Sequence, residues 1–365
     1  MAQKHEMDIR TATRGYEAWL GGFLTLLPAD LRLKHQRMRA DVFWFLRATY
    51  YRWAQVWPRV CPEAARAPAV LAVGDLHVEN FGTWRDAEGR LIWGVNDFDE
   101  VWTMPFTNDL VRLVASALLA AEAEHLKVQP QTAAEAVLGG YREALAKGGG
   151  ALVLAENHLA LRNVAVHRLK DPAVFWAKLT RLPTLRQKLP AKVARVLAKT
   201  LPQPHPPCRY VHRVVGLGSL GRQRFVALAQ WHGGLLAREA KALAPSALLW
   251  ARGEGARPEN RYQEILDHAI RCPDPFVRPR RRWLVRRLSP DCSRIELSDL
   301  PAERDEKRLL HAMGWETANI HLGAGKAGAI QRWLAQREAR WLHEAAQKMA
   351  QAVREDWRAW RQAAR

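Results

Sequence analysis

The feature that most constrains the fold of this chain is a pair of short acidic motifs in its first third. Residues 74–80 read Gly-Asp-Leu-His-Val-Glu-Asn, and residues 96–100 read Asn-Asp-Phe-Asp-Glu. Between them, residues 86–90 (Asp-Ala-Glu-Gly-Arg) are typical of a hairpin turn, and residues 91–95 form an apolar run that predicts a buried strand. The chain must therefore place a loop, a hairpin and a second acidic loop in this order.

The spacing of these motifs indicates a chemistry. Asp75 and Asn80 are separated as in the H-R-D-x-x-x-x-N catalytic loop of enzymes that transfer the terminal phosphoryl group of ATP. In that loop the Asp orients the attacking hydroxyl and the Asn binds Mg²⁺, which prefers oxygen ligands. We therefore predict that Asp75 is the catalytic base or the residue that orients the nucleophile. Asn80 and Asp97 are the predicted metal ligands, and Asp99 is a second choice. Because Asp and Asn are common turn residues, a loop without a site is the alternative.

The same residues resemble known families. Residues 74–80 are similar to the G-D-x-H-x-x-N loop of aminoglycoside phosphotransferases and related small-molecule kinases. More closely, residues 74–116 resemble the bacterial domain-of-unknown-function family 2252, with further patches at 45–47 and 315–318. The resemblance covers most of the chain and implies a kinase-like fold rather than a particular substrate. It also implies that Asp109 opens the next helix and braces the catalytic loop, although a plain helix cap is an equal alternative.

A second motif follows in the other half of the chain. Residues 209–215, 224–229 and 235–241 are predicted strands, and a Gly-rich loop joins the first two. Because a strand follows the loop, a kinase-type phosphate loop is favoured over a Rossmann loop, which opens a helix. A Gly-rich hairpin without a ligand is the alternative. The residues predicted to cover the phosphates of ATP are Gly216, Gly218, Ser219 and Gly221.

Two features depart from ordinary kinases. First, the Gly loop follows the catalytic loop, so the predicted α+β fold is protein-kinase-like, bilobal and circularly permuted. Its largely helical catalytic lobe precedes a small antiparallel-sheet nucleotide lobe. Second, the family's third strand has Lys before Glu-Ala, where this chain has Arg238. Arg238 and Lys241 point to opposite faces of an ideal strand, so one of them is predicted to contact phosphate. A nucleotide-binding pseudokinase remains an alternative.

The expected organisation has four parts, separated most clearly by the Pro-rich connector 201–207. The parts are an N-terminal helical segment (1–65), a catalytic region with the metal site (66–200), a Gly-loop nucleotide lobe (208–250) and a C-terminal helical region (251–365). In the C-terminal region, the tryptophans of the amphipathic segment 327–363 are expected to pack in the core.

The charge of the chain suggests a further type of partner. Lys and Arg total 56 against 37 for Asp and Glu, which gives a formal charge of +19. Such an excess attracts nucleic acid and other polyanions, and the densest basic cluster is 278–287. The alternative is that the arginines reflect coding bias and lie on solvated surfaces. A polyanion-binding protein without turnover is thus a second functional hypothesis, and nucleotidyl transfer is a third.

Other sequence features bear on location. We find no apolar run long enough to span a bilayer and no signal-peptide core. The four cysteines are scattered without a C-x-x-C pair, which disfavours a disulfide framework or a metal cluster. A cytoplasmic phosphotransferase that uses ATP and Mg²⁺ is therefore the leading prediction. The pattern defines neither the hydroxyl-bearing acceptor nor an oligomeric state.

Overall fold

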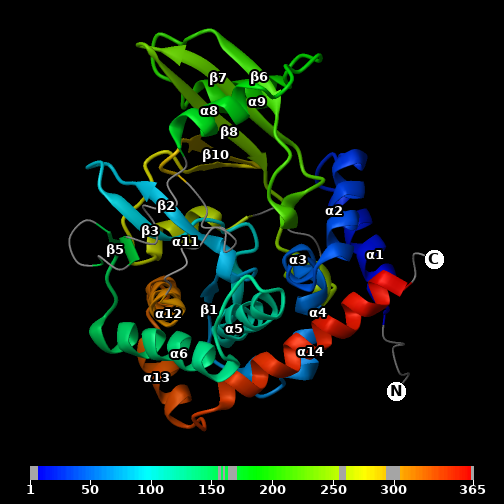
Figure 1. Ribbon diagram of the computed structural model, residues 1–365, viewed down its shortest axis with the longest axis vertical. Coiled ribbons are helices and arrows are strands. Elements are labelled where there is room, and N and C mark those ends of the chain that lie inside the picture. Colours follow the sequence, from blue (N-terminus) through cyan, green and yellow to red (C-terminus); the bar gives the residue numbers. More distant parts are fainter. Residues whose placement is uncertain are drawn as a thin grey trace.

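The computed structural model describes residues 7–154, 158, 161–162, 171–254, 260–292 and 305–362. These residues form an α+β structure in which a five-stranded sheet stands at one end of a largely helical body (Figure 1). In chain order the helices and strands are α1 (Ile9–Gly21), α2 (Pro28–Ala40), α3 (Val42–Ala48), α4 (Tyr50–Val60), β1 (Ala69–Ala72), β2 (Phe81–Arg85), β3 (Leu91–Val95), β4 (Trp102–Pro105), α5 (Thr107–Glu122), α6 (Pro130–Lys147), β5 (Leu152–Val153), α8 (Pro172–Thr180), α9 (Ala191–Ala198), β6 (Cys208–His212), β7 (Arg224–Trp231), β8 (Gly234–Ala242), α10 (Ala247–Arg252), α11 (Tyr262–His268), β9 (Arg278–Arg280), β10 (Trp283–Leu288), α12 (Glu306–Leu322), α13 (Ala327–Ala335) and α14 (Trp341–Gln362).

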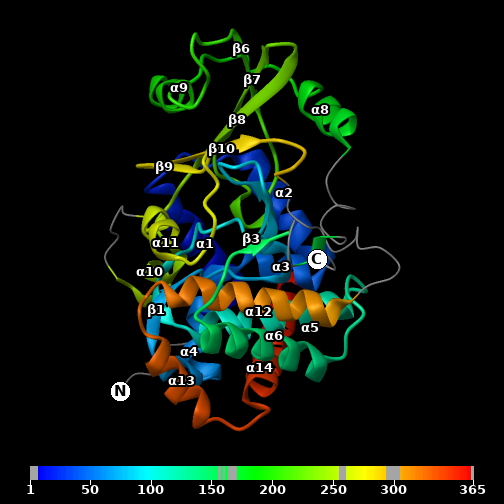
Figure 2. The ribbon, with the colours of Figure 1, turned by 90° about the vertical axis from the view of Figure 1, so that its left-hand side faces the viewer.

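The five-stranded sheet has the order β6-β7-β8-β10-β9 and is antiparallel throughout. Its side chains alternate between two faces, as the pleat of a strand requires. On one face, Val226 and Leu228 of β7 pack with α8, and on the other, Phe225 and Ala227 pack with α9. In the turned view α8 and α9 lie on opposite sides of the sheet (Figure 2).

The helical body is built around α5, whose residues Thr107 to Ala120 are all buried. The helices α6 and α12 pack against each other through close backbone contact. A Cβ atom on Gly140 would lie 1.9 Å from the carbonyl oxygen of His311, and one on Gly314 would lie 2.0 Å from that of Val137. Glycine at these two positions therefore allows the two helices to pack without a gap. The body holds most of the hydrophobic core.

Several sequence predictions of local structure are confirmed. The predicted strand at 91–95 is β3, and the predicted strands at 209–215, 224–229 and 235–241 are β6, β7 and β8. The C-terminal segment forms α13 and α14, where Trp360 is buried and Trp333, Trp341 and Trp357 are partly buried. The mixed α+β class is also confirmed.

The structure differs from the expected division in two respects. The helices α8 and α9 precede the Pro-rich connector in sequence but pack on the sheet that follows it. The segment 278–288, placed in a C-terminal helical region, instead forms β9 and β10 of the same sheet. This segment forms strands because β10 pairs with the distant strand β8 and buries Val285 and Leu288. Local periodicity shows neither the pairing nor the burial. Within the region expected at 66–200, residues 155–157, 159–160 and 163–170 lie outside the described residues.

Candidate active site

The loop that carries Asp75 follows β1 and is held by hydrogen bonds to the side chain of Asp109, in the first turn of α5. The Asp109 carboxylate accepts hydrogen bonds from the backbone N–H groups of Val73 (2.7 Å) and Gly74 (2.9 Å). Its Oδ2 also lies 3.1 Å from Nε2 of the buried His321. Asp109 therefore braces the loop and does more than begin a helix. Gly74 has a φ of +85°, and a Cβ there would lie 2.5 Å from the carbonyl oxygen of Glu100, so the turn requires glycine.

The Asp75 carboxylate is held at one oxygen only. The fully buried guanidinium of Arg112 donates its Nε–H to Asp75 Oδ1 at 2.9 Å, and its Nη2 also bonds Oδ1. Arg112 is itself enclosed by the rings of Tyr50 and Trp53, at 5.0 and 4.9 Å from the ring centroids. Among the described residues none hydrogen-bonds to Oδ2 of Asp75. Burial raises the pKa of the Asp75 carboxyl, although the Arg112 guanidinium opposes this rise.

Asn80 lies directly beside Asp75. Its Nδ2 donates to the Asp75 carbonyl oxygen at 2.6 Å, so its Oδ1 is the atom available to a ligand in the cavity that both residues line. The 3₁₀ turn Val78–Asn80 places this side chain, and the backbone N–H of Asn80 donates to the His77 carbonyl oxygen at 2.8 Å. The predicted pair Asp75 and Asn80 is therefore brought together by the loop itself.

Asp97 and Asp99 follow β3, and both contact Lys241. The Lys241 Nζ atom is 3.3 Å from each carboxylate oxygen of Asp97 and 2.5 Å from Oδ2 of Asp99. Oδ1 of Asp99 is buried without a hydrogen-bond partner. Burial raises the pKa of Asp99, and the neighbouring Asp97 carboxylate raises it further. Lys241 thus neutralises two carboxylates that would otherwise repel each other.

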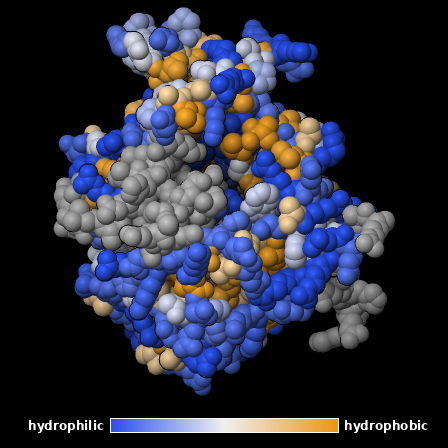
Figure 3. Space-filling view, in the orientation of Figure 1, coloured by the Kyte–Doolittle hydropathy of each residue, from blue (hydrophilic) through white to orange (hydrophobic). Residues whose placement is uncertain are grey.

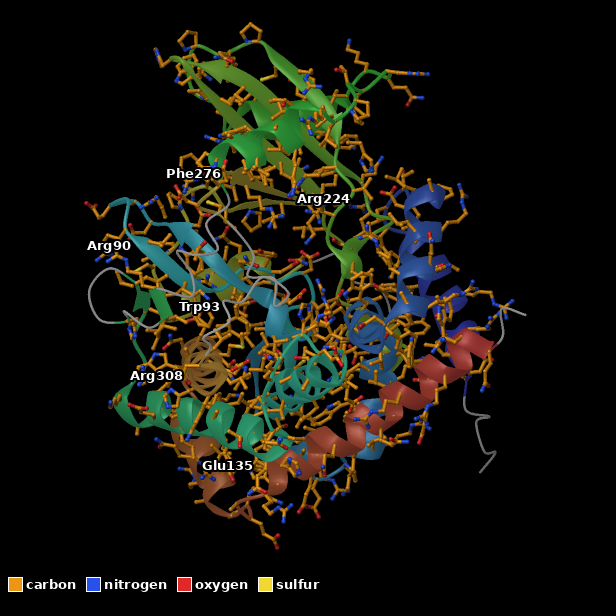
Figure 4. All side chains as sticks on the ribbon, viewed as in Figure 1. Arg90, Trp93, Glu135, Arg224, Phe276 and Arg308 are labelled. Atoms are coloured by element: carbon orange, nitrogen blue, oxygen red, sulfur yellow. The ribbon has the colours of Figure 1, made fainter. Side chains whose placement is uncertain are left out.

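Strand register explains why Lys241, and not Arg238, reaches this site. Lys241 pairs with Arg224 across β7 and β8, and Glu239 pairs with Val226, which puts Lys241 and Glu239 on the face that points to the helical body. Arg238 is on the other face, where its Nε–H donates to the Thr200 carbonyl oxygen at 2.9 Å. Its guanidinium stacks 4.6 Å from the Phe276 ring, which lies apart from Arg224 in Figure 4. Arg238 is therefore outside the site.

The Gly-rich loop covers Asp75 from the sheet side. It contains a 3₁₀ turn at Leu217–Ser219, and Gly216 and Gly221 have φ values of +77° and +96°. A Cβ on Gly218 would lie 3.0 Å from the Arg47 carbonyl oxygen and 3.5 Å from Oδ2 of Asp75. One on Gly221 would meet the Leu31 side chain at 2.4 Å. The loop therefore closes a cavity of about 40 Å³ above Asp75, with Gly216, Gly218 and Ser219 in its wall.

A larger cavity of about 310 Å³ adjoins the first, and both are lined by Asp97 and Gly216. On its sheet side the buried Glu239 carboxylate pairs with Arg224 and Arg286 at 2.7 Å and with Arg213 at 2.9 Å. Burial alone would raise the pKa of Glu239, but these guanidinium groups hold it well below its usual range. On the face shown in Figure 3 the surface is hollowed between the sheet and the helical body.

Three charged residues at this site were not predicted from the sequence. Arg112 could have been inferred from its position three residues after Asp109 on the same helix face. Arg222 bonds Asp99 and Glu100 at 3.3 Å each, but its position after Gly221 carries no specific signal. Lys34 of α2 lines the smaller cavity, and nothing in its local sequence indicates this.

The donor set around Asp97 suits a hard cation. Within the described ranges, no group of three or more His, Cys, Asp or Glu side chains is arranged to hold a metal ion. The predicted set instead combines the two carboxylates of Asp97 and Asp99 with the Asn80 amide oxygen. Oxygen donors of this kind are those that Mg²⁺ accepts, and the unpartnered Oδ1 of Asp99 is a vacant donor among them.

The molecule is thus an α+β protein in which an acidic loop of a helical body faces a Gly-rich loop of an antiparallel sheet. A family model described as "Uncharacterized protein conserved in bacteria (DUF2252)" matches residues 26–174 and 209–363, and the chain belongs to this family. No curated protein and no solved structure gave a match to the chain. Among the helices that the structure describes, none is long and apolar enough to cross a membrane.

Proposed function

We propose that this protein is a Mg²⁺- and ATP-dependent phosphotransferase with a hydroxyl-bearing acceptor, built on a circularly permuted kinase-like fold. The observation that carries the proposal is the meeting of Asp75, Asp97, Lys241 and the Gly-rich loop around adjoining cavities. These groups are far apart in sequence. Phosphoryl transfer depends on positioning and charge neutralisation rather than on covalent chemistry by the protein, and these groups can supply both.

Asp75 acts on the acceptor in this proposal. Arg112 fixes Oδ1, which leaves Oδ2 to accept the hydroxyl proton as the acceptor oxygen bonds to the transferred phosphorus. The bond from that phosphorus to the ADP leaving group breaks in the same transfer. The raised pKa of Asp75 favours this role, because a stronger base accepts a proton more readily near neutral pH.

Asn80, Asp97 and Asp99 hold the metal, and Mg²⁺ when bound would neutralise charge on the phosphates. Lys241 exchanges its contacts with Asp97 and Asp99 for a phosphate oxygen. Two aspects of the geometry support this: the Lys241 ammonium already lies between these carboxylates, and Asp99 has a free buried oxygen. A divalent cation is a stronger counter-charge for two carboxylates than one ammonium group.

The larger cavity is the proposed nucleotide site. Its volume is about 310 Å³, at the lower end of the range of small-molecule sites, and it opens beside the Gly-rich loop. Three guanidinium groups around one carboxylate leave its sheet side positively charged toward a polyphosphate. Trp84, Tyr262 and Leu288 provide apolar surface for a base.

Calorimetry of ATP binding with and without Mg²⁺ tests the proposal. We expect the wild type to bind ATP only with Mg²⁺, and Asp97→Asn to lose that binding. Asp305→Asn is the matched control: Asp305 caps α12, and Asn is an equally good cap, so binding should be unchanged. Failure of the wild type to bind Mg²⁺–ATP would remove the nucleotide site and with it the phosphotransferase.

A second candidate is binding of a polyanion such as nucleic acid. It is favoured by Arg278, Arg280, Arg281 and Arg282, which are exposed on the edge strand β9 and the turn to β10. Salt-dependent retention of nucleic acid without nucleotide turnover, weakened by Arg278→Gln with Arg280→Gln, would support it. The same double change at Arg358 and Arg361 on α14 is the control for net charge.

A further inference from the structure

The smaller cavity contains a cation that the proposed reaction does not yet use. Lys34, in the middle of α2, lines this cavity together with Asp75 and Arg222, and its side chain is 3% exposed. Within the described part of the chain Lys34 makes no hydrogen bond or ion pair. Its Nζ lies 5.8 Å from the centroid of the Tyr51 ring.

A buried ammonium group without a partner is costly, so its position calls for an explanation. Other buried cations around the site have a carboxylate partner: Arg112 pairs with Asp75, Lys241 with Asp97 and Asp99, and Arg222 with Asp99 and Glu100. Burial lowers the pKa of Lys34 to about 8, with Glu17, Glu100 and Asp75 opposing the shift and Arg222 adding to it. Because Lys34 lines the cavity, an anion that enters it from outside the chain can supply the counter-charge.

We propose that Lys34 binds a carboxylate of the acceptor, so that the acceptor is a small hydroxy acid whose hydroxyl faces Oδ2 of Asp75. This inference rests on the proposed phosphotransferase function and names its substrate class. The two groups line the same cavity, from α2 and from the loop after β1. Lys34 recognises the acceptor, and Asp75 accepts its hydroxyl proton.

The size of the cavity limits the acceptor to a small molecule. Its volume of about 40 Å³ holds roughly three water molecules. A hydroxymethyl group next to a carboxylate has only five non-hydrogen atoms, and the single charge of the carboxylate matches the single ammonium group of Lys34. The Gly-rich loop closes the same space, because Gly218 approaches Asp75 Oδ2. A bulky acceptor therefore fits this cavity poorly.

Binding of three probes to the full chain tests this inference. Glycolate carries a hydroxyl and a carboxylate, ethylene glycol is its neutral counterpart, and glycerol 3-phosphate carries a phosphate instead. We expect the wild type to bind glycolate at least about tenfold more tightly than ethylene glycol, which is the usual effect of one charge-assisted hydrogen bond. Lys34→Met should abolish this preference, and Lys192→Met on the exposed face of α9 should keep it.

Each other result overturns the inference. Equal binding of glycolate and ethylene glycol by the wild type, or a glycolate preference that survives in Lys34→Met, would show that Lys34 does not recognise an anion. A preference for glycerol 3-phosphate over glycolate would replace the carboxylate by a phosphate. Mg²⁺–ATP binding is measured on the same variants. If the wild type does not bind Mg²⁺–ATP, the proposed phosphotransferase function fails. Glycolate binding that depends on Lys34 would in that case still identify an anion site, but not an acceptor site.

Discussion

The two loops that face each other across the site are held in different ways. The loop after β1 is anchored by the buried side chains of Asp109, Ser116 and Arg112, which bond its backbone or its Asp75. In the Gly-rich loop the side-chain hydrogen bonds come from the turn itself and from β7: Ser219 bonds the Gly216 carbonyl oxygen at 3.2 Å, and Arg224 bonds Ser219 at 2.8 Å. Its far end is tied by the Gly221 carbonyl oxygen to Leu27 at 2.8 Å.

This difference in anchoring matches the different tasks proposed for the two loops. Groups that direct a proton need a fixed geometry, which buried hydrogen bonds to charged groups supply. A loop that covers phosphates gains from backbone N–H groups and small residues, which need few side-chain anchors. We therefore expect loss of a side-chain anchor to cost much stability on the Asp75 side and little at Ser219 of the Gly-rich loop.

The largest expected effect is that of Asp75→Asn. Loss of the base should lower kcat by about 10²- to 10⁴-fold, while Mg²⁺–ATP binding persists. Asn keeps an oxygen that Arg112 can bond, so the fold should survive. Single-turnover kinetics on the variant, with Asp305→Asn beside it, measures the effect. Wild-type turnover in Asp75→Asn would show that the proton passes elsewhere.

Next in size is Asp109→Ala, which tests the anchored loop directly. It leaves the N–H groups of Val73 and Gly74 and the His321 ring without their acceptor in a fully buried position. We expect the free energy of unfolding to fall by about 3–5 kcal/mol. Urea denaturation provides the measurement. A loss below about 1 kcal/mol would mean that this loop is not held by Asp109.

Lys34→Met should act in the opposite direction and raise stability. The ordinary lysine pKa of 10.5 applies to the unfolded chain, and the folded value is about 8, so below pH 8 the folded state carries an unfavourable buried charge. Removing it should stabilise the fold by about 2–3 kcal/mol at pH 7. Between pH 8 and 10.5 the wild type loses this penalty as Lys34 deprotonates, so its stability relative to Lys34→Met rises.

Thermal unfolding at pH 7 and near pH 10 checks both the sign and the window. The Tm difference between Lys34→Met and the wild type should be largest at the lower pH and should shrink at the higher one. Lys192→Met, an exposed change of the same kind, should show neither effect. A destabilised Lys34→Met at pH 7 would indicate that Lys34 has a partner within the fold.

The smallest effect is expected for Ser219→Ala in the Gly-rich loop. It removes the hydroxyl that bonds Gly216 and Arg224, while Arg224 keeps its ion pair with Glu239. The unfolding free energy should fall by about 0.5–1 kcal/mol. The ratio of this loss to that of Asp109→Ala measures how differently the two loops are held, and equal losses would contradict the contrast.

Much of the local structure of the site was predictable. The order of Asp75, Asn80 and Asp97, the hairpin between them and the strand β3 follow from turn residues and an apolar run. The alternation of strand side chains also correctly implied that Arg238 and Lys241 take opposite faces. Which of the two faces the site was not predictable, because that depends on which side of the sheet the helical body covers.

The sequence by itself determined the family, the α+β class and the spacing of the acidic motifs, since these depend on residues that are neighbours along the chain. Tertiary structure alone decided that Lys241 meets Asp97 and Asp99, that Arg222 meets Glu100, and that Lys34 enters the cavity beside Asp75. The physical reason is that buried charges find partners through the packing of distant elements. Periodicity records which side of a helix is apolar, but not which charge lies opposite it.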